Sequence, residues 1–212
     1  MSFEDLSKTQ LDVLREIGNI GAGNAATSMA QLINRQVNMN VPSVNVVTFD
    51  QMMDILGGPD ATVVALFFRF HGDAPGTVYF ILTIEKAQLL IKKMTSNDSI
   101  DLFDENGDVH AFALSTLKEA GNIMTGSYLS ALADFLQLDL QSSIPHISID
   151  MAAAVLTPAL VEVSQVSDYA IVINTEINEM KLDTGIHGHF FLIPDVDSFS
   201  KIFNKLGIEG NE

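Results

Sequence analysis

Two segments of the chain repeat the same pattern, and this internal repeat constrains the possible folds more than any other feature of the sequence. Residues 11–20 align with residues 114–123, and the register then continues to Pro42 and Pro145. Each copy has Asp or Ser, then Glu four residues later, Asn three residues after the Glu, and Pro 23 residues after the Asn. A repeat of this kind predicts two structural units of the same type.

Each copy predicts a long helix, a strand, a short helix, a β-hairpin and a closing helix. Apolar residues at helical spacing predict long helices over about residues 8–35 and 111–137. The side expected to be buried comprises Leu11, Leu14, Gly18, Gly21, Ala25, Met29 and Leu32 in the first helix, and Leu114, Leu117, Gly121, Tyr128, Leu132 and Phe135 in the second. Runs rich in β-forming residues, joined by turn residues, predict hairpins over 61–83 and 169–193, and closing helices over 84–94 and 196–206.

The short halves indicate a shared core. Two units of about 100 residues with few strands each would hardly bury a core alone, so we expect one joint sheet in an α/β fold of the α+β type. The chain is predicted to be a single domain over residues 1–212, built from repeats at about 8–94 and 111–206. The polar, turn-rich segment 95–110 is the linker between them.

Composition narrows the class of protein. The 212 residues include no Cys, which excludes disulfides and a Cys nucleophile. The net charge of −16 argues against nucleic acid as a partner. Residues 94–200 hold 16 acidic and only 2 basic side chains, a balance that gives solubility or suits a partner with a basic surface. The acidic N-terminus lacks an apolar segment and the longest apolar run, 151–163, is short, so a cytoplasmic protein without membrane insertion is expected.

A Glu and an Asn one turn apart are the candidate chemical groups of each copy. On the first helix, Glu16 and Asn19 project away from the apolar side, and Glu119 and Asn122 do the same on the second. Such pairs are also common on ordinary helix surfaces. The repeat nevertheless keeps this pair while exposed neighbours change, and it keeps a helix-weakening Gly before each Asn, at Gly18 and Gly121.

Two explanations for these glycines remain open. Another protein's backbone could approach the exposed side of the helix, or the glycines could allow the two long helices to pack closely. In the first case the pair suits phosphoryl hydrolysis: a carboxamide can orient a water molecule, and a carboxylate can bind a Lys or Arg of the partner. Phosphate binding and metal binding would then have to come from the substrate.

Other motifs are interpreted as structural. Gly21 to Ala26 match a dinucleotide-binding pattern, but they lie inside a helix with no strand before them. His187 and His189 would share one face of a strand without a third metal ligand. Pro42 and Pro145 are expected to orient the entry into the following strand.

The doubled motif, with Glu-Ile-Gly-Asn-Ile-Gly-Ala-Gly-Asn-Ala-Ala in the first copy and Glu-Ala-Gly-Asn-Ile-Met-Thr-Gly in the second, resembles the CheC/CheX/FliY family. The resemblance runs almost end to end. It implies two pseudo-twofold-related halves with the long helices side by side over an antiparallel sheet. It also implies a phosphatase of the phosphorylated chemotaxis regulator CheY. Glu16 and Glu119 would contact the regulator's Lys, Asn19 and Asn122 would direct water onto its phosphoaspartate, and Mg²⁺ would belong to CheY, with no cofactor in this chain.

The resemblance further implies binding of the receptor deamidase CheD. The docking segment would be a short helix over residues 150–156, with Asp150 and Met151 as contacts. Apolar residues in the same segment could instead be core. Two other functions stay open: a non-catalytic adaptor for phosphorylated CheY and CheD, or a binding module like the middle domain of a flagellar switch protein. The short segments outside the first and last predicted helices argue against the switch protein, as does the doubled Glu/Asn motif.

Overall fold

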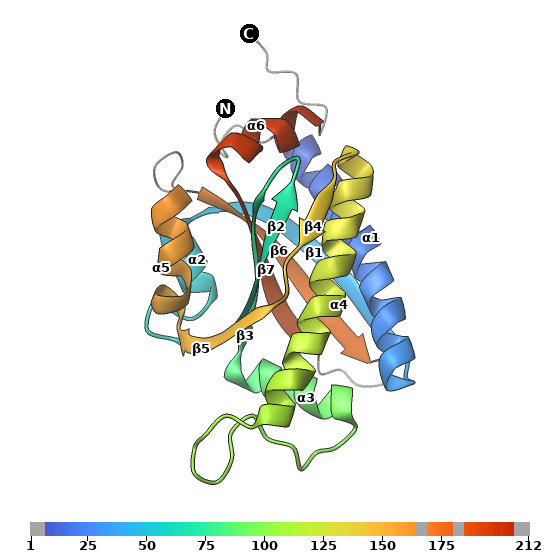
Figure 1. Ribbon diagram of the computed structural model, residues 1–212, viewed down its shortest axis with the longest axis vertical. Helices are drawn as coiled ribbons and strands as arrows, with labels where there is room; N and C mark the ends of the chain where they lie inside the picture. The colour runs from blue at the N-terminus through green and yellow to red at the C-terminus, as the bar shows by residue number, and fades with distance from the viewer. Residues whose placement is uncertain (1–6, 164–168, 180–184, 206–212) are drawn as a thin grey trace.

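The computed structural model describes residues 7–163, 169–179 and 185–205, in which helices lie on both faces of one sheet (Figure 1). The helices and strands follow in the order α1 (Lys8–Ile33), β1 (Val37–Thr48), α2 (Phe49–Ile55), β2 (Thr62–Gly72), β3 (Gly76–Thr83), α3 (Ile84–Thr95), α4 (Ala111–Leu136), β4 (Leu140–Ser142), β5 (His146–Met151), α5 (Ala152–Val163), β6 (Tyr169–Glu179), β7 (Ile186–Pro194) and α6 (Val196–Lys205). Apart from Gly185, the predicted turn after β6 lies outside the described residues, as do Met180 and Leu206, the predicted last residues of β6 and α6.

The two halves of the chain build one sheet together. Its strand order is β1-β6-β7-β3-β2-β4, with β5 also paired to β2, and each pairing is antiparallel. The pairings β1–β6, β3–β7, β2–β4 and β2–β5 each join a strand of the first half to a strand of the second. The predicted fold class, one antiparallel sheet shared by two similar halves, is therefore confirmed.

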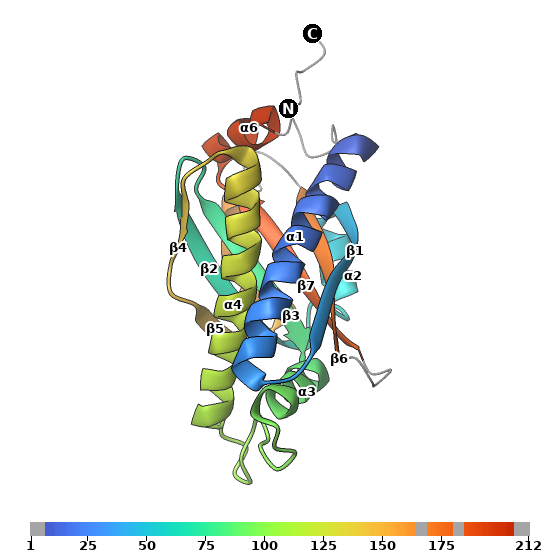
Figure 2. The same cartoon turned by 90° about the vertical axis from the view of Figure 1, so that its right-hand side faces the viewer.

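The sheet separates two apolar cores. The larger core lies between the sheet and α1, α3 and α4, and includes Leu66, Phe80 and Phe190. The smaller core lies on the opposite face, beneath α2 and α5, around Met52 and Leu156. Figure 2 shows α1 and α4 side by side and antiparallel along one face, as the resemblance implies.

The long helices begin and end close to the predicted residues. Ser7 caps α1 in a capping box with Gln10, and both α1 and α4 end at residues in the left-handed conformation, Asn34 and Gln137. The predicted buried side is wrong at the last turns. Leu32 and Phe135 are 52% and 50% exposed, whereas Met29 and Leu136 in the same parts of the two helices are 1% exposed, so the buried side of each helix is narrower than predicted.

The strand after the first long helix differs from its counterpart. β1 continues from Val37 to Thr48, whereas the second copy breaks between β4 and β5 around Pro145. The prediction that Pro42 orients the entry into the following strand is wrong. Pro42 lies inside β1, where the pairing with β6 shifts register between Asn40 and Ser43. A proline has no N–H to donate, so a bulge is a position where a strand tolerates it.

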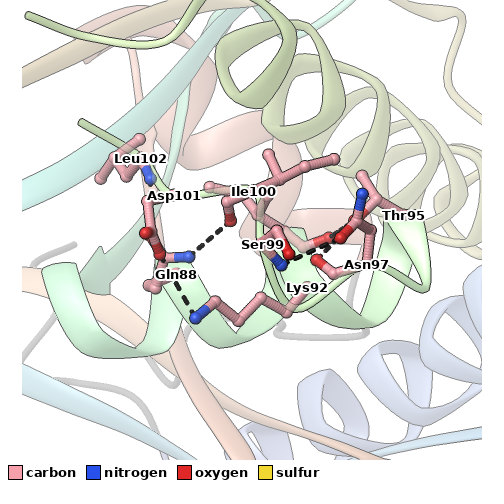
Figure 3. Close-up of polar contacts among 9 residues, drawn as sticks. Gln88, Lys92, Thr95, Asn97, Ser99, Ile100, Asp101 and Leu102 are labelled. Carbon is pink, nitrogen blue, oxygen red and sulfur yellow. Dashed lines mark hydrogen bonds and ion pairs between the residues drawn. The ribbon is translucent and has the colours of Figure 1, made fainter. Parts of the chain in front are cut away.

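The linker between the repeats is held against α3. The side chain of Gln88 donates to the carbonyl of Ile100 (2.8 Å) and accepts from the N–H of Leu102 (2.6 Å), and Lys92 pairs with Asp101 at 3.3 Å (Figure 3). Leu102 is buried in the larger core. Among the described residues, no helix has the length and apolar character needed to cross a membrane.

Candidate functional site

The two Glu/Asn pairs lie on separate sides of the contact between α1 and α4. The helices run antiparallel (Figure 2), and Gly21 of α1 packs against the backbone of Tyr128 of α4. Asn19 precedes this contact along α1 and Asn122 precedes it along α4. The pairs therefore form two separate candidate sites and not one joint site.

The first pair is partly engaged in the fold itself. The Asn19 carboxamide donates to the carbonyls of Arg15 (3.1 Å) and Val41 (3.4 Å), and its oxygen accepts from the N–H of Val41 (2.9 Å). Val41 lies at the bulge of β1, where its backbone groups leave the ladder with β6. Asn19 thus satisfies both backbone polar groups of a buried residue, while Glu16 is exposed.

The second pair is free of such contacts. Glu119 and Asn122 are both exposed on α4, and no described residue forms a hydrogen bond or ion pair with either side chain. The residue that corresponds to Val41 is Ile144, which is 77% exposed in the break between β4 and β5. Among the described residues none bonds Asn122 as Val41 bonds Asn19, and the Asn122 side chain is exposed.

The glycines that precede the two motif asparagines pack against the sheet and not against another protein. Gly18 and Gly121 are buried, and a Cβ would lie 3.2 Å from the Val41 side chain at Gly18 and 2.5 Å from Leu66 at Gly121. They let each helix approach the sheet. The expectation that they admit another protein's backbone is wrong, and close packing of the two helices instead involves Gly21, whose Cβ would lie 2.8 Å from Tyr128 Cα.

A second glycine lies one helical turn after each motif Asn, and it makes no close packing contact. A Cβ at Gly23 or Gly126 would meet nothing within 4 Å. A glycine inside a helix costs roughly 1 kcal/mol relative to alanine. Packing against the described residues therefore does not explain why glycine occupies these two positions.

No metal centre is evident near either pair. Within the described ranges, no three His, Asp or Glu side chains are grouped so that they could hold a metal ion. His187 lies 3.5 Å from Glu176, and His189 Nδ1 lies 2.7 Å from Asn174 Oδ1, on the sheet face opposite α1 and α4. Burial lowers the pKa of His189, and the neighbouring His187 lowers it further. This group is remote from the Glu/Asn pairs.

The predicted docking segment is placed differently from the prediction. Asp150 and Met151 end β5, and α5 begins only at Ala152 and continues to Val163, so the predicted helix over 150–156 is wrong at both ends. Val155 and Leu156 are core residues. Asp150 and Met151 are exposed, and the exposed side of α5 continues from them along Ala154, Thr157, Pro158 and Val161.

Two features of the sites were missed in the sequence. The bond between Asn19 and Val41 joins residues 22 positions apart and left no local signal. The second feature is Phe112, which is 54% exposed on α4, two turns before Glu119. Its counterpart in the first copy is Thr9, so comparing the repeats position by position would have found it.

Comparisons with known proteins agree with this arrangement. The model of the CheC-like family matches residues 10–46 and 112–149, which include both Glu/Asn pairs. The chain is 42% identical to the CheY-P phosphatase CheC of Bacillus subtilis over 205 residues, 97% of each chain. It is 27% identical to the flagellar motor switch phosphatase FliY of the same organism over 69% of this chain and 37% of that protein.

Solved structures share the fold. The crystal structure of Thermotoga maritima FliY superposes with a TM-score of 0.73 at 20% identity, over 96% of this chain and 98% of that one. The FliM middle domain of H. pylori gives a TM-score of 0.64 at 15% identity, over 94% and 99%. At this level of identity the likeness concerns the fold alone. The near full-length relative from B. subtilis and the match to the family model show that the chain belongs to the CheC-like family.

Proposed function

We propose that the chain is a phosphatase that hydrolyses the phosphoaspartate of the chemotaxis response regulator CheY. The observation that supports this most strongly is the exposed pair Glu119 and Asn122, whose side chains no described residue engages. The B. subtilis relative, named as a CheY-P phosphatase, is similar along nearly its whole length. A pair of this kind can position a water molecule and a partner's cation, and little more is needed for phosphoryl transfer.

The proposed reaction requires no group from this chain to form a covalent bond. The Asn carboxamide would hold a water molecule through one hydrogen bond donated and one accepted, in line with the phosphorus atom. The water oxygen forms a bond to phosphorus, the bond from phosphorus to the aspartyl oxygen breaks, and inorganic phosphate and a free carboxylate result. The Glu carboxylate would bind the regulator's Lys through a charge-assisted hydrogen bond. Mg²⁺ would be held by the regulator and offset charge on the phosphoryl group there.

The two sites are expected to differ in activity. Asn122 can accept a water molecule at once, whereas Asn19 would first have to release the N–H and carbonyl of Val41. Leaving those buried backbone groups without partners opposes that release. We therefore assign most of the hydrolysis to Glu119 and Asn122, and a smaller share to Glu16 and Asn19.

The test is the decay of phosphorylated CheY with Mg²⁺ in the presence of the wild type, Asn19→Ala, Asn122→Ala and the double variant. The wild type should accelerate decay, and Asn122→Ala should remove most of the acceleration, on the order of 10²-fold for a lost positioning group. The double variant should leave only spontaneous decay. An unchanged decay rate with the folded wild type would make the chain a non-catalytic module that binds phosphorylated CheY.

A second surface is proposed as the docking site for CheD. Asp150 and Met151 are exposed at the end of β5, and α5, which follows them directly, has exposed apolar residues on its outer side. Asp150→Lys and Val161→Glu should weaken binding of CheD in a pull-down while hydrolysis of CheY-P stays unchanged. Val161 lies on α5, and Asp150 pairs with Val63 and faces the same side of the sheet, across from the Glu/Asn pairs. Undiminished CheD binding by both variants would remove this surface from consideration.

A further inference from the structure

An apolar patch lies where the linker enters α4, at the end of the helix that leads to the second site. It consists of Phe103, Val109 and Phe112, which are 37%, 37% and 54% exposed. We propose that this patch is a docking contact for the receiver domain of the phosphorylated regulator and gives the second site a higher affinity than the first. This inference rests on the proposed function, because it concerns how the same substrate protein is bound.

Phe112 lies on the same side of α4 as the second Glu/Asn pair. It precedes Glu119 by seven residues, which places it about 20° around the helix and about 10 Å along it. The buried side of α4, which includes Leu117, Met124 and Tyr128, points the opposite way. A protein that covers Glu119 and Asn122 over an area typical of a specific interface would therefore extend over Phe112 as well.

The linker presents the other two residues in a fixed position. Phe103 and Val109 face each other in a β-bridge, so their side chains are neighbours. The segment before them is held by Gln88, which bonds the backbone of Ile100 and Leu102, and by the ion pair of Lys92 with Asp101 (Figure 3). An apolar contact that is already ordered loses little conformational freedom on binding.

The chemistry around the patch suits a basic partner surface. Glu105 and Asp108 are exposed in the turn between Phe103 and Val109. Glu119 adds a further carboxylate on the side of α4 that bears Phe112. A receiver domain that offers a Lys beside its phosphoaspartate, and apolar residues around it, would match this combination of a central apolar contact and a charged rim.

The long helix of the first copy lacks the aromatic residue. Thr9 occupies the position in α1 that corresponds to Phe112 in α4. The repeat that keeps Glu and Asn in both copies thus keeps the aromatic residue in only one. The second copy also has the asparagine whose side chain is not bonded within the fold. The second site therefore combines the docking contact for the regulator with an asparagine that can position water.

The test compares Phe112→Thr, which installs the residue of the first copy, with Phe135→Thr. Phe135 is equally exposed on α4 but points about 160° away from Glu119. The rate of CheY-P hydrolysis is measured against CheY-P concentration for both variants and the wild type. Phe112→Thr should raise KM about tenfold with kcat retained, as for loss of one aromatic contact, and Phe135→Thr should match the wild type. In an Asn122→Ala background, where the first site alone remains, Phe112→Thr should change nothing.

The outcomes separate the two proposals. If the wild type hydrolyses CheY-P and Phe112→Thr leaves KM within twofold, the patch is not a docking contact and the proposed function stands. If the wild type is inactive, titration of the chain with beryllofluoride-activated CheY decides: tenfold weaker binding by Phe112→Thr supports the patch without catalysis. Unchanged or absent binding overturns the patch as well. A second variant, Phe103→Ser with Val109→Ser, should reproduce the KM effect without touching α4.

Discussion

The motif asparagine has a different environment in each copy, and the difference can be measured as stability. Asn19 bonds the N–H and the carbonyl of Val41, which is buried, whereas no described residue forms a hydrogen bond with the Asn122 carboxamide. Asn19→Ala should therefore lower the free energy of unfolding by about 1–3 kcal/mol, because two backbone groups lose their partners. Asn122→Ala should stay within about 0.5 kcal/mol of the wild type.

Urea unfolding followed by circular dichroism measures the free energy of unfolding of both asparagine variants. The matched pair controls for the substitution itself, since each replaces Asn by Ala in the middle of a 26-residue helix. Equal stability of the two variants would contradict a structural role for Asn19. The same experiment informs the activity assay, because it shows whether loss of activity in Asn19→Ala reflects unfolding.

The buried side chain of His189 is expected to make the folded protein less stable at acidic pH. Burial lowers its pKa, so the unfolded chain, with a histidine pKa near 6.5, binds more protons than the folded one at acidic pH. This contribution to stability is complete above about pH 6.5 and is lost as the pH falls below it. The urea midpoint should decline between about pH 7.5 and about pH 5.5. His189→Gln should show a smaller decline; an equal or steeper one would exclude His189 as its source.

At the scale of the elements, two glycines of α1 are expected to respond in opposite ways to replacement by alanine, because one is packed against α4 and the other is exposed. Gly21→Ala would place a Cβ 2.8 Å from the Cα of Tyr128 and should push α1 from α4, with a cost of about 1–3 kcal/mol. Gly23→Ala, two residues later, meets nothing within 4 Å and should raise stability by about 0.5–1 kcal/mol through helix propensity. Thermal melts of both variants test this pair, and destabilisation by Gly23→Ala would show a contact that the fold does not explain.

The periodic patterns predicted most elements because those patterns arise from burial against one sheet. The long helices, both hairpins and the two closing helices begin within a few residues of the predicted positions. The errors occur where contacts with distant parts of the chain determine whether a residue is buried or a strand continues. Leu32 and Phe135 fit the apolar period of their helices but are exposed, and the break around Pro145 depends on how β4 and β5 share β2 as a partner.

The candidate site was predictable only as far as the repeat revealed it. Position-by-position identity indicated Glu16, Asn19, Glu119 and Asn122, and helical periodicity placed both glutamates and Asn122 on exposed surfaces. Periodicity could not show that β1 passes beside Asn19, because that contact depends on the course of a strand 22 residues away. For the same reason it gave the wrong neighbours for Gly18 and Gly121, which pack on the sheet.

At the scale of the whole molecule, the shared sheet allows the two copies to diverge. One copy has an unbroken strand at the edge of the sheet and uses its Asn to complete that strand, while the other has a broken strand and a free Asn. Both long helices can still pack on the same sheet, because the glycines that bring them close are present in each copy. A change in one site therefore does not require a change in the other.

The same shared sheet predicts that the halves depend on each other for folding. β1 pairs only with β6 among the described strands, and β3 lies between β2 and β7, so the first half alone would leave β1 without a partner and α1 without α4. Each half expressed alone should lack cooperative unfolding in urea. Cleavage of the intact protein after Glu105, in an exposed turn, should leave the halves associated on gel filtration, since four strand pairings and the contact of α1 with α4 join them. The uncut protein is the control, and a first half that unfolds cooperatively by itself would show that the repeats are two independent domains.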